Sequence, residues 1–151
     1  YYDVRGFIGN NVPKVNPAEG KKLMEKLSEA ISMGLVKACH DCSEGGIGVA
    51  SAEMAFSGGF GMKIQLKNIP YSEDVVRNDT ILFSESNSRF LVEASKENQA
   101  EFEKIMSGTD TAVIGEVTNN DKFIVYGLDG NIIVSASIND LKDAWQKTFR
   151  W

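Results

Sequence analysis

The chain has 151 residues, of which 42% are hydrophobic and 25% are charged, and its formal net charge at pH 7 is -5. These values are typical of one globular domain that can bury a core without covalent cross-links. Because lysine and arginine do not cluster and no run approaches the about 20 apolar residues of a membrane span, the sequence excludes non-specific binding to nucleic acid and a transmembrane helix.

The first 16 residues predict an extended segment that precedes the folded domain. Glycines, asparagines and a proline disfavour regular structure there. The chain starts at Tyr1 instead of methionine and carries no signal-peptide pattern. We therefore expect residues 1–16 to lead in from a missing upstream domain and residues 17–151 to form the domain itself.

The first half of the domain predicts alternating helices and strands. A helix is expected to begin at Pro17, because Asn16 can cap it and Glu19 can reach back to the cap, and Gly34 is expected to end it. The short apolar run 35–39 predicts a buried strand. The elements expected after it are a helix over 47–56, a strand over 61–66 and a polar loop over 67–79.

The second half predicts more strands than helices. The expected strands cover 80–83, 89–94, 111–118, 122–126 and 132–135. A helix is expected over 96–106, and a last helix that starts near Ser137 carries Trp145 as a packing residue. Asp129 and Gly130 are typical of a hairpin turn between the last two strands. The whole pattern predicts one α+β domain with helices packed on a mixed sheet.

The glycine-rich segment 40–48 is the first candidate site, because a buried strand is expected to end there and a helix to begin. Helix starts attract anions through unsatisfied N–H groups and the helix dipole, and Gly45 and Gly46 have no Cβ to obstruct the approach. Asp41 is a candidate ligand for Mg²⁺, and Ser43 is placed either to cap the helix or to touch a phosphate. The alternative is a tight connection that binds nothing.

The one histidine and the two cysteines lie in or beside the same segment. His40 would be the default general base, but a lone histidine beside an apolar strand is more often a hydrogen-bonded structural residue, which we favour. Cys39 and Cys42 have the spacing of half a zinc site, and the chain lacks the further ligands that would complete it. If the strand extends as far as Cys42, its alternation would point the two sulfurs to opposite faces, and ordinary buried thiols in a reducing cytoplasm are expected.

The segment 83–90 is the second candidate site. Hydroxyl and amide side chains, the Glu85 carboxylate and the Arg89 guanidinium lie there between two apolar runs. Arg89 is suited to bind a phosphate or a carboxylate through two hydrogen bonds. The alternative is a polar hairpin loop in which Glu85 and Arg89 form an exposed ion pair of little energetic value.

These segments resemble the motifs of a known superfamily. Residues 40–50 and 52–55 are similar to the HD-x-SEGG-x-x-VA-x-AEMA signature shared by aminoimidazole ribonucleotide synthetase, selenophosphate synthetase, thiamine-monophosphate kinase and formylglycinamidine ribonucleotide synthase. The FSES run at 83–86 and the SRF run at 88–90 look like a segment in the last domain of the formylglycinamidine synthase family, and IGEV at 114–117 resembles a late strand of that domain. The resemblance extends over nearly the whole chain.

The resemblance implies a three-layer α/β/α fold, partly ferredoxin-like, as in the C-terminal domain of aminoimidazole ribonucleotide synthetase. It implies one domain of an ATP-dependent ligase of purine biosynthesis that converts formylglycinamide ribonucleotide, glutamine and ATP to formylglycinamidine ribonucleotide, glutamate, ADP and phosphate. The implied cofactors of the full-length enzyme are ATP and Mg²⁺. The implied partners are upstream ATP-binding domains, a separate glutaminase subunit and a small helper subunit, all in the cytoplasm, with no nucleic acid or membrane partner.

The matching positions imply ligand-facing roles and assign no catalytic residue. They are Ser43, Gly45, Gly46, Glu85, Ser86 and Arg89 for phosphate or substrate, and Asp41 for Mg²⁺. We expect the isolated chain to be inactive and to hold no tightly bound cofactor, and we expect the native protein to end near Trp151. The alternatives are the last domain of another superfamily member, aminoimidazole ribonucleotide synthetase first, or a non-catalytic ligand-binding or structural module.

Overall fold

The computed structural model describes residues 1–9, 12–71 and 76–147. The fold is α+β, with helices packed on a mixed sheet, as predicted. The helices are α1 (Pro17–Ser32), α2 (Gly46–Gly58), the 3₁₀ turn η1 (Leu66–Asn68), α3 (Asn78–Phe83), α4 (Gln99–Met106) and α5 (Ile138–Gln146). The strands are β1 (Val36–Asp41), β2 (Gly61–Gln65), β3 (Phe90–Ala94), β4 (Gly115–Thr118), β5 (Lys122–Tyr126) and β6 (Ile132–Ser137).

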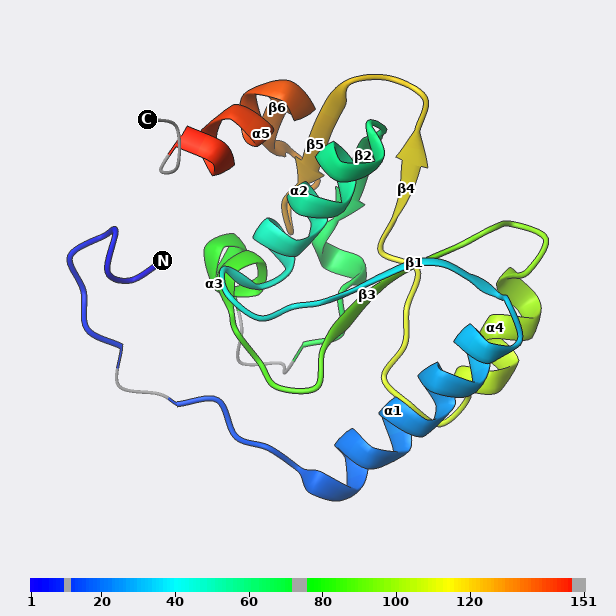
Figure 1. Ribbon diagram of the computed structural model, residues 1–151. Coiled ribbons are helices and arrows are strands. Elements are labelled where there is room, and N and C mark those ends of the chain that lie inside the picture. The colour runs from blue at the N-terminus through cyan, green and yellow to red at the C-terminus, as the bar shows by residue number, and fades with distance from the viewer. Residues whose placement is uncertain (10–11, 72–75, 148–151) are drawn as a thin grey trace.

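The strands are divided between two sheets. β1 and β3 form an antiparallel two-stranded ribbon, and the other four strands form a sheet in the order β4-β2-β5-β6. In this second sheet β2 and β5 are parallel while both outer pairs are antiparallel, so the sheet is mixed. Helix α2 contacts both the ribbon and the larger sheet (Figure 1). The start of α2 is therefore held from two sides.

Two apolar cores stabilise this arrangement. In the larger core, α2 packs against the inner face of the four-stranded sheet, where Ile64 and Val125 are almost completely buried. In the smaller core, α1 and α4 pack on the opposite side of the ribbon, around Leu27, Ala30 and Phe102. Burial of a valine, leucine, isoleucine or phenylalanine side chain contributes about 1.5–3 kcal/mol, so the two cores fix the ribbon between α2 and the α1–α4 pair.

Helix α1 starts and stops where its sequence predicts. The side chain of Asn16 accepts hydrogen bonds from the N–H groups of Ala18 and Glu19 at 3.2 and 3.4 Å, which satisfies donors that have no partner within the helix. Pro17 occupies the first turn, and Gly34 follows the helix with a φ of 73°. Figure 1 shows α1 beside α4.

One predicted strand is wrong. Residues 80–83 belong to α3, a short helix in which Ser84 N–H donates to the carbonyl of Thr80 and Ile81 N–H donates to that of Arg77. A four-residue apolar run does not distinguish a strand from one turn of a buried helix, and burial of Ile81 and Leu82 is compatible with either. The side chain of Asp79, which accepts from the N–H of Thr80, favours the helix.

Most of the other predicted elements are confirmed with bounds that differ by a few residues, and the loop predicted over 67–79 includes part of η1 and the start of α3. The strand expected over 111–118 begins only at Gly115, and the helix expected over 96–106 begins at Gln99. The hairpin turn forms as predicted, with Gly130 at a φ of 79° between the paired strands β5 and β6. Ser137 caps α5 by accepting from Asn139 N–H at 3.1 Å. None of the described helices is long and apolar enough to cross a membrane.

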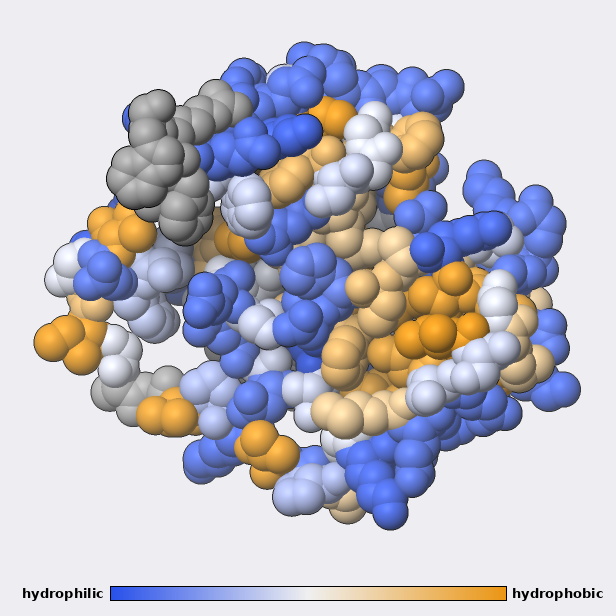
Figure 2. Space-filling model, viewed as in Figure 1, coloured by the Kyte–Doolittle hydropathy of each residue, from blue (hydrophilic) through white to orange (hydrophobic). Residues whose placement is uncertain are grey.

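The leading segment is not simply extended. Residues 2–6 form hydrogen-bonded turns, and the ring of Tyr1 stacks on Phe83 at 4.7 Å while its hydroxyl donates to Asp79 at 2.7 Å. Figure 1 shows the segment passing along one side of the molecule to reach α1. Figure 2 shows orange side chains along it and an opening between it and the rest of the chain. Its exposed apolar residues are Tyr1, Tyr2, Val4, Phe7, Ile8, Val12 and Val15.

Candidate functional site

The site is built on the turn between β1 and α2. β1 ends at Asp41, and α2 begins after Gly45 and Gly46, whose φ angles are 76° and 60°. Residues with a side chain rarely adopt such angles, so this turn requires glycine at both positions. The N-cap of α2 is Gly45. Ser43 is therefore not the cap, which corrects one of the two roles considered for it.

Gly46 is needed for a second reason, which is close packing against α3. A Cβ at this position would lie 2.6 Å from the carbonyl oxygen of Ser84 and 2.8 Å from that of Leu82. Backbone atoms cannot move aside as the end of a flexible side chain can. The space that Gly46 leaves open therefore holds the end of α3, and at this residue the geometry favours the tight-connection interpretation.

Gly45 connects the two candidate segments. Its N–H group donates to Oε1 of Glu85 at 2.9 Å, across 40 residues of sequence. The acceptor is a carboxylate at the positive end of a helix, the position where an anion is stabilised. The structure thus brings the turn 41–46 and the segment 84–89 into contact, and places a carboxylate of the chain itself at the N-terminus of α2.

Asp41 and Ser43 lie on the exposed side of the turn. The Ser43 hydroxyl donates to Oδ2 of Asp41, and this hydrogen bond lowers the pKa of the Asp41 carboxyl below its ordinary value. The carboxylate is exposed to solvent. Within the described residues no group of three or more His, Cys, Asp or Glu side chains could hold a metal ion. Asp41 could therefore supply only one carboxylate ligand to Mg²⁺, and water or phosphate oxygens would have to supply the others.

Arg89 and Ser86 complete the second segment. The Nη1 atom of Arg89 is buried and is the one such side-chain atom without a hydrogen-bond partner in the described part of the chain. Burial also lowers the pKa of this guanidinium. Ser86 Oγ lies 2.8 Å from Ser84 Oγ. Glu85 bonds to Gly45, and among the described residues no ion pair joins it to Arg89, so the exposed pair of the hairpin alternative does not form.

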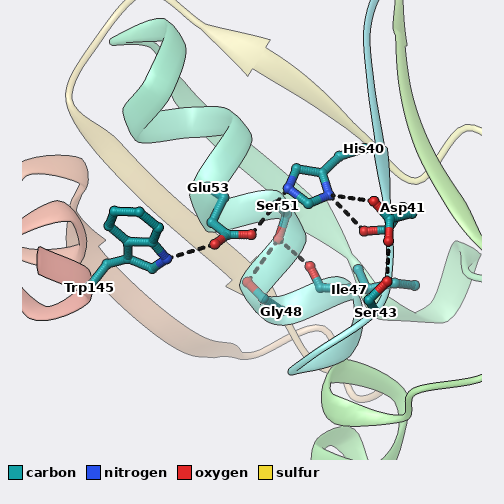
Figure 3. Close-up of polar contacts among 8 residues, drawn as sticks. All are labelled: His40, Asp41, Ser43, Ile47, Gly48, Ser51, Glu53 and Trp145. Carbon is teal, nitrogen blue, oxygen red and sulfur yellow. Dashed lines mark hydrogen bonds and ion pairs between the residues drawn. The ribbon is translucent and has the colours of Figure 1, made fainter. Parts of the chain in front are cut away.

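His40 is a hydrogen-bonded structural residue, as favoured from the sequence. Its Nδ1 lies 2.6 Å from the carbonyl oxygen of Asp41, and its Nε2 lies 3.1 Å from Oε2 of Glu53. The other oxygen of Glu53 accepts from Nε1 of Trp145 at 2.7 Å. Figure 3 shows these side chains in line, from α5 through α2 to the end of β1.

Glu53 and Trp145 were missed as partners of the turn. Glu53 falls within the AEMA part of the motif and is the one ionisable residue of α2, which is a signal that sequence inspection could have used. Trp145 was assigned to packing, and its ring does lie 5.9 Å from that of Phe56. Its hydrogen bond spans 92 residues of sequence, and no local pattern could reveal that contact.

The two cysteines differ in burial. Cys39 lies within β1, and Cys42 follows the last residue of that strand. Cys39 is exposed and Cys42 is buried, so the expectation of two buried thiols is wrong for Cys39. Burial raises the pKa of the Cys42 thiol to about 11, which keeps it protonated and unreactive at neutral pH. The N–H of Cys42 donates to the carbonyl of Arg89 at 2.9 Å, which ties the turn to the second segment.

Comparison with known proteins gives one family match and several long relatives. Residues 3–127 match the family model "AIR synthase related protein, C-terminal domain". Phosphoribosylformylglycinamidine synthase subunit PurL of Methanococcus aeolicus is 32% identical over 91% of the chain, and that of Deinococcus radiodurans is 33% identical over 97%. The chain spans only 18% and 19% of the lengths of these curated relatives.

Solved structures show the same fold. Thermotoga maritima PurL complexed with FGAR has a TM-score of 0.78 at 24% identity, covering 86% of this chain and 22% of that one. The hydrogenase maturation protein HypE of Escherichia coli has a TM-score of 0.62 at 20% identity, covering 76% of this chain and 38% of that one. Proteins with different functions therefore share this α+β fold, and the fold alone does not show which function the chain has.

Proposed function

Since the chain belongs to the family of AIR synthase related proteins and constitutes their C-terminal domain, we propose that it is the last domain of a formylglycinamidine ribonucleotide synthase. Relatives named PurL that align with 91% and 97% of the chain support this choice. Aminoimidazole ribonucleotide synthetase is the alternative within the same family. A non-catalytic module is the other alternative.

The proposed reaction belongs to the whole polypeptide. ATP phosphorylates the amide oxygen of formylglycinamide ribonucleotide, ammonia from the hydrolysis of glutamine displaces the phosphate, and the products are the amidine, glutamate, ADP and phosphate. A Thermotoga maritima PurL has been solved with ATP, and another structure is of PurLQS from the same organism. For this chain we propose upstream ATP-binding domains, a separate glutaminase subunit and a small helper subunit as partners, in the cytoplasm.

The contact between Gly45 and Glu85 is the observation that carries a ligand-facing role for this domain. It brings the start of α2 next to the segment that holds Arg89, whose buried Nη1 has no hydrogen-bond partner among the described residues. A phosphate or carboxylate oxygen would satisfy that nitrogen with a charge-assisted bond. We propose that Ser43, Gly45, Glu85, Ser86 and Arg89 face the phosphate or substrate, that Gly46 shapes the turn that holds them, and that Asp41 supplies one ligand to Mg²⁺.

Substitution of Arg89 in the longer polypeptide tests this proposal. Calorimetry would measure binding of Mg·ATP and of formylglycinamide ribonucleotide to the wild type, to Arg89→Met and to Arg77→Met. Arg77 is a matched control, because its guanidinium is exposed and is already bonded to Asp79. Loss of one charge-assisted bond of about 1.5–3 kcal/mol predicts an affinity about tenfold or more lower for one ligand in Arg89→Met only. Unchanged affinities for both ligands would contradict the proposed site.

The identity of the substrate separates the two enzymes of the family. Binding of formylglycinamide ribonucleotide supports the synthase, whereas binding of its amidine product alone would favour aminoimidazole ribonucleotide synthetase. Binding of neither, in a polypeptide that folds, would favour the non-catalytic module.

A further inference from the structure

A line of three side chains connects α5 to the turn at the start of α2. Trp145 Nε1–H donates to one carboxylate oxygen of Glu53, and the other oxygen lies 3.1 Å from Nε2 of His40. Nδ1 of the same imidazole lies 2.6 Å from the carbonyl oxygen of Asp41. We call this line the Glu53 bridge, and it consists of Trp145, Glu53 and His40 (Figure 3).

The chemistry of the acceptors fixes how the imidazole is held. A carbonyl oxygen can only accept, so Nδ1 of His40 must be the donor to Asp41. Nε2 then faces a carboxylate oxygen of Glu53, and a proton must lie between them for the contact to be attractive. The ring is thus held at both nitrogens, and rotation about its side-chain torsions would break at least one of the two hydrogen bonds.

Glu53 is the central member, since it touches both of the others. Its carboxylate lies on a helix that otherwise carries no ionisable side chain, and it is only partly exposed, at 23% of its side-chain area. Removal of a partly buried carboxylate would leave both the indole N–H and the imidazole without their acceptor. Trp145 belongs to α5, which packs on α2, so the position of α5 determines one of the two contacts of Glu53.

We propose that Glu53 is a positioning residue that transmits the placement of α5 to the turn 41–46. Held by Trp145, it keeps His40 against the carbonyl of Asp41 and so fixes the peptide that leads into Ser43 and Gly45. A shift of α5 would loosen that peptide. This proposal rests on the proposed function only in assuming that the turn 41–46 binds a ligand.

Two variants of the 151-residue chain separate this role from simple packing. Trp145→Phe keeps an aromatic ring beside Phe56 and removes only the indole donor. Leu141→Ala is the matched control, because Leu141 packs on the same core from α5 without belonging to the Glu53 bridge. The readout is the set of backbone amide NMR signals of Gly45 and Gly46. These signals are expected to shift in Trp145→Phe and to stay near their wild-type positions in Leu141→Ala.

A conservative replacement of Glu53 tests whether its two hydrogen bonds are what hold the turn. Gln can accept from the indole with its amide oxygen and donate to a neutral imidazole with its amide nitrogen, so Glu53→Gln is expected to keep the wild-type turn signals. Alanine can make neither hydrogen bond, so Glu53→Ala is expected to shift the signals of Gly45 and Gly46. The double variant Glu53→Ala, Trp145→Phe is expected to shift them no further than Glu53→Ala alone. The proposal is overturned if Trp145→Phe leaves the Gly45 and Gly46 signals unchanged, or if Leu141→Ala shifts them equally.

Ligand binding is measured separately, so that this proposal and the proposed function can fail independently. In the longer polypeptide, with Mg·ATP as the probe, loss of one hydrogen bond of about 1 kcal/mol predicts an affinity about fivefold weaker for Trp145→Phe. Shifted turn signals without Mg·ATP binding by the wild type would support the Glu53 bridge and count against a nucleotide site. Unshifted signals overturn the bridge whatever binds.

Discussion

Gly46 is a residue at which the surrounding backbone leaves no space for a side chain. A methyl group there would collide with two backbone carbonyls, and its φ of 60° adds strain. We expect Gly46→Ala to lower the free energy of unfolding by about 3 kcal/mol or more, measured by urea denaturation. Gly130→Ala is the matched control, because Gly130 has a φ of 79° and open space around it, and left-handed strain alone costs about 1–2 kcal/mol. Equal losses would show that the contact with α3 is unimportant.

Arg89 is expected to reduce the stability of the free chain. Its buried Nη1 has no hydrogen-bond partner in the described residues, and a buried, unsatisfied nitrogen on a charged group is unfavourable. Arg89→Met keeps most of the side-chain volume, and we expect it to raise the free energy of unfolding by about 1 kcal/mol. Arg77→Met, which removes a bonded guanidinium, is expected to leave it unchanged or lower. A clear loss of stability in Arg89→Met would mean that the guanidinium is satisfied in solution.

At the residue scale, the sequence predicts features that depend on neighbouring residues and misses contacts between residues that are far apart in the chain. The strained turn could be predicted, because paired glycines between a buried strand and a helix have few other structural uses. The contact of Gly45 with Glu85 and that of Glu53 with Trp145 join residues 40 and 92 positions apart. Such contacts depend on how whole elements pack. Only a resemblance to a family could suggest the contact between Gly45 and Glu85, and nothing in the sequence suggested the contact between Glu53 and Trp145.

At the element scale, α3 shows why short apolar segments are ambiguous. Residues 80–83 are as apolar as a strand, and their position between polar segments fits either structure. Longer elements were predicted well, since the 16-residue helix α1 carries a cap, a first-turn proline and a terminal glycine that agree with each other. The six-residue helix α3 has one such signal, Asp79, whose side chain accepts from the N–H of Thr80.

Asp79 also connects α3 to the start of the chain, and this connection is expected to depend on pH. Hydrogen bonds from Arg77 and then from Tyr1 hold the pKa of Asp79 well below its ordinary value of 3.8. A carboxyl whose pKa is lowered by folding stabilises the fold above the unfolded pKa and loses this effect as the pH falls through the folded value. The exposed position of the pair limits the effect to about 0.5–1 kcal/mol.

Acid titration of stability would measure this contribution. We expect Asp79→Asn to lower the free energy of unfolding at pH 7 and to reduce its decline below pH 3.8, relative to the wild type. Asp110→Asn is the control, because Asp110 is an exposed aspartate between α4 and β4. The same acid decline in the wild type and in Asp79→Asn would show that Asp79 is not held by Arg77 and Tyr1 in solution.

At the scale of the whole molecule, α2 lies between two sheets, and no strand pairing joins these sheets in the described residues. The sequence predicts the number and order of most strands, yet it predicts one mixed sheet where the structure has a ribbon and a separate four-stranded sheet. Strand pairing is set by long-range packing, and the register shift between Val36 and Ala38 has no local signal. The division matters for function, because the ribbon delivers Asp41 and His40 to one end of α2 while the larger sheet positions α5 and Trp145.

The isolated chain is expected neither to hydrolyse ATP nor to form the amidine. The chain spans about a fifth of the lengths of its PurL relatives, it has no Walker sequence, and Asp41 would supply only one ligand to Mg²⁺. The measurement is phosphate release by the purified chain with ATP, Mg²⁺, formylglycinamide ribonucleotide and ammonia, beside the longer polypeptide as a positive control. Turnover above background that disappears in Asp41→Asn would contradict this prediction, because a contaminating ATPase would be unaffected by that substitution. Such a result would mean that a complete site resides in these 151 residues.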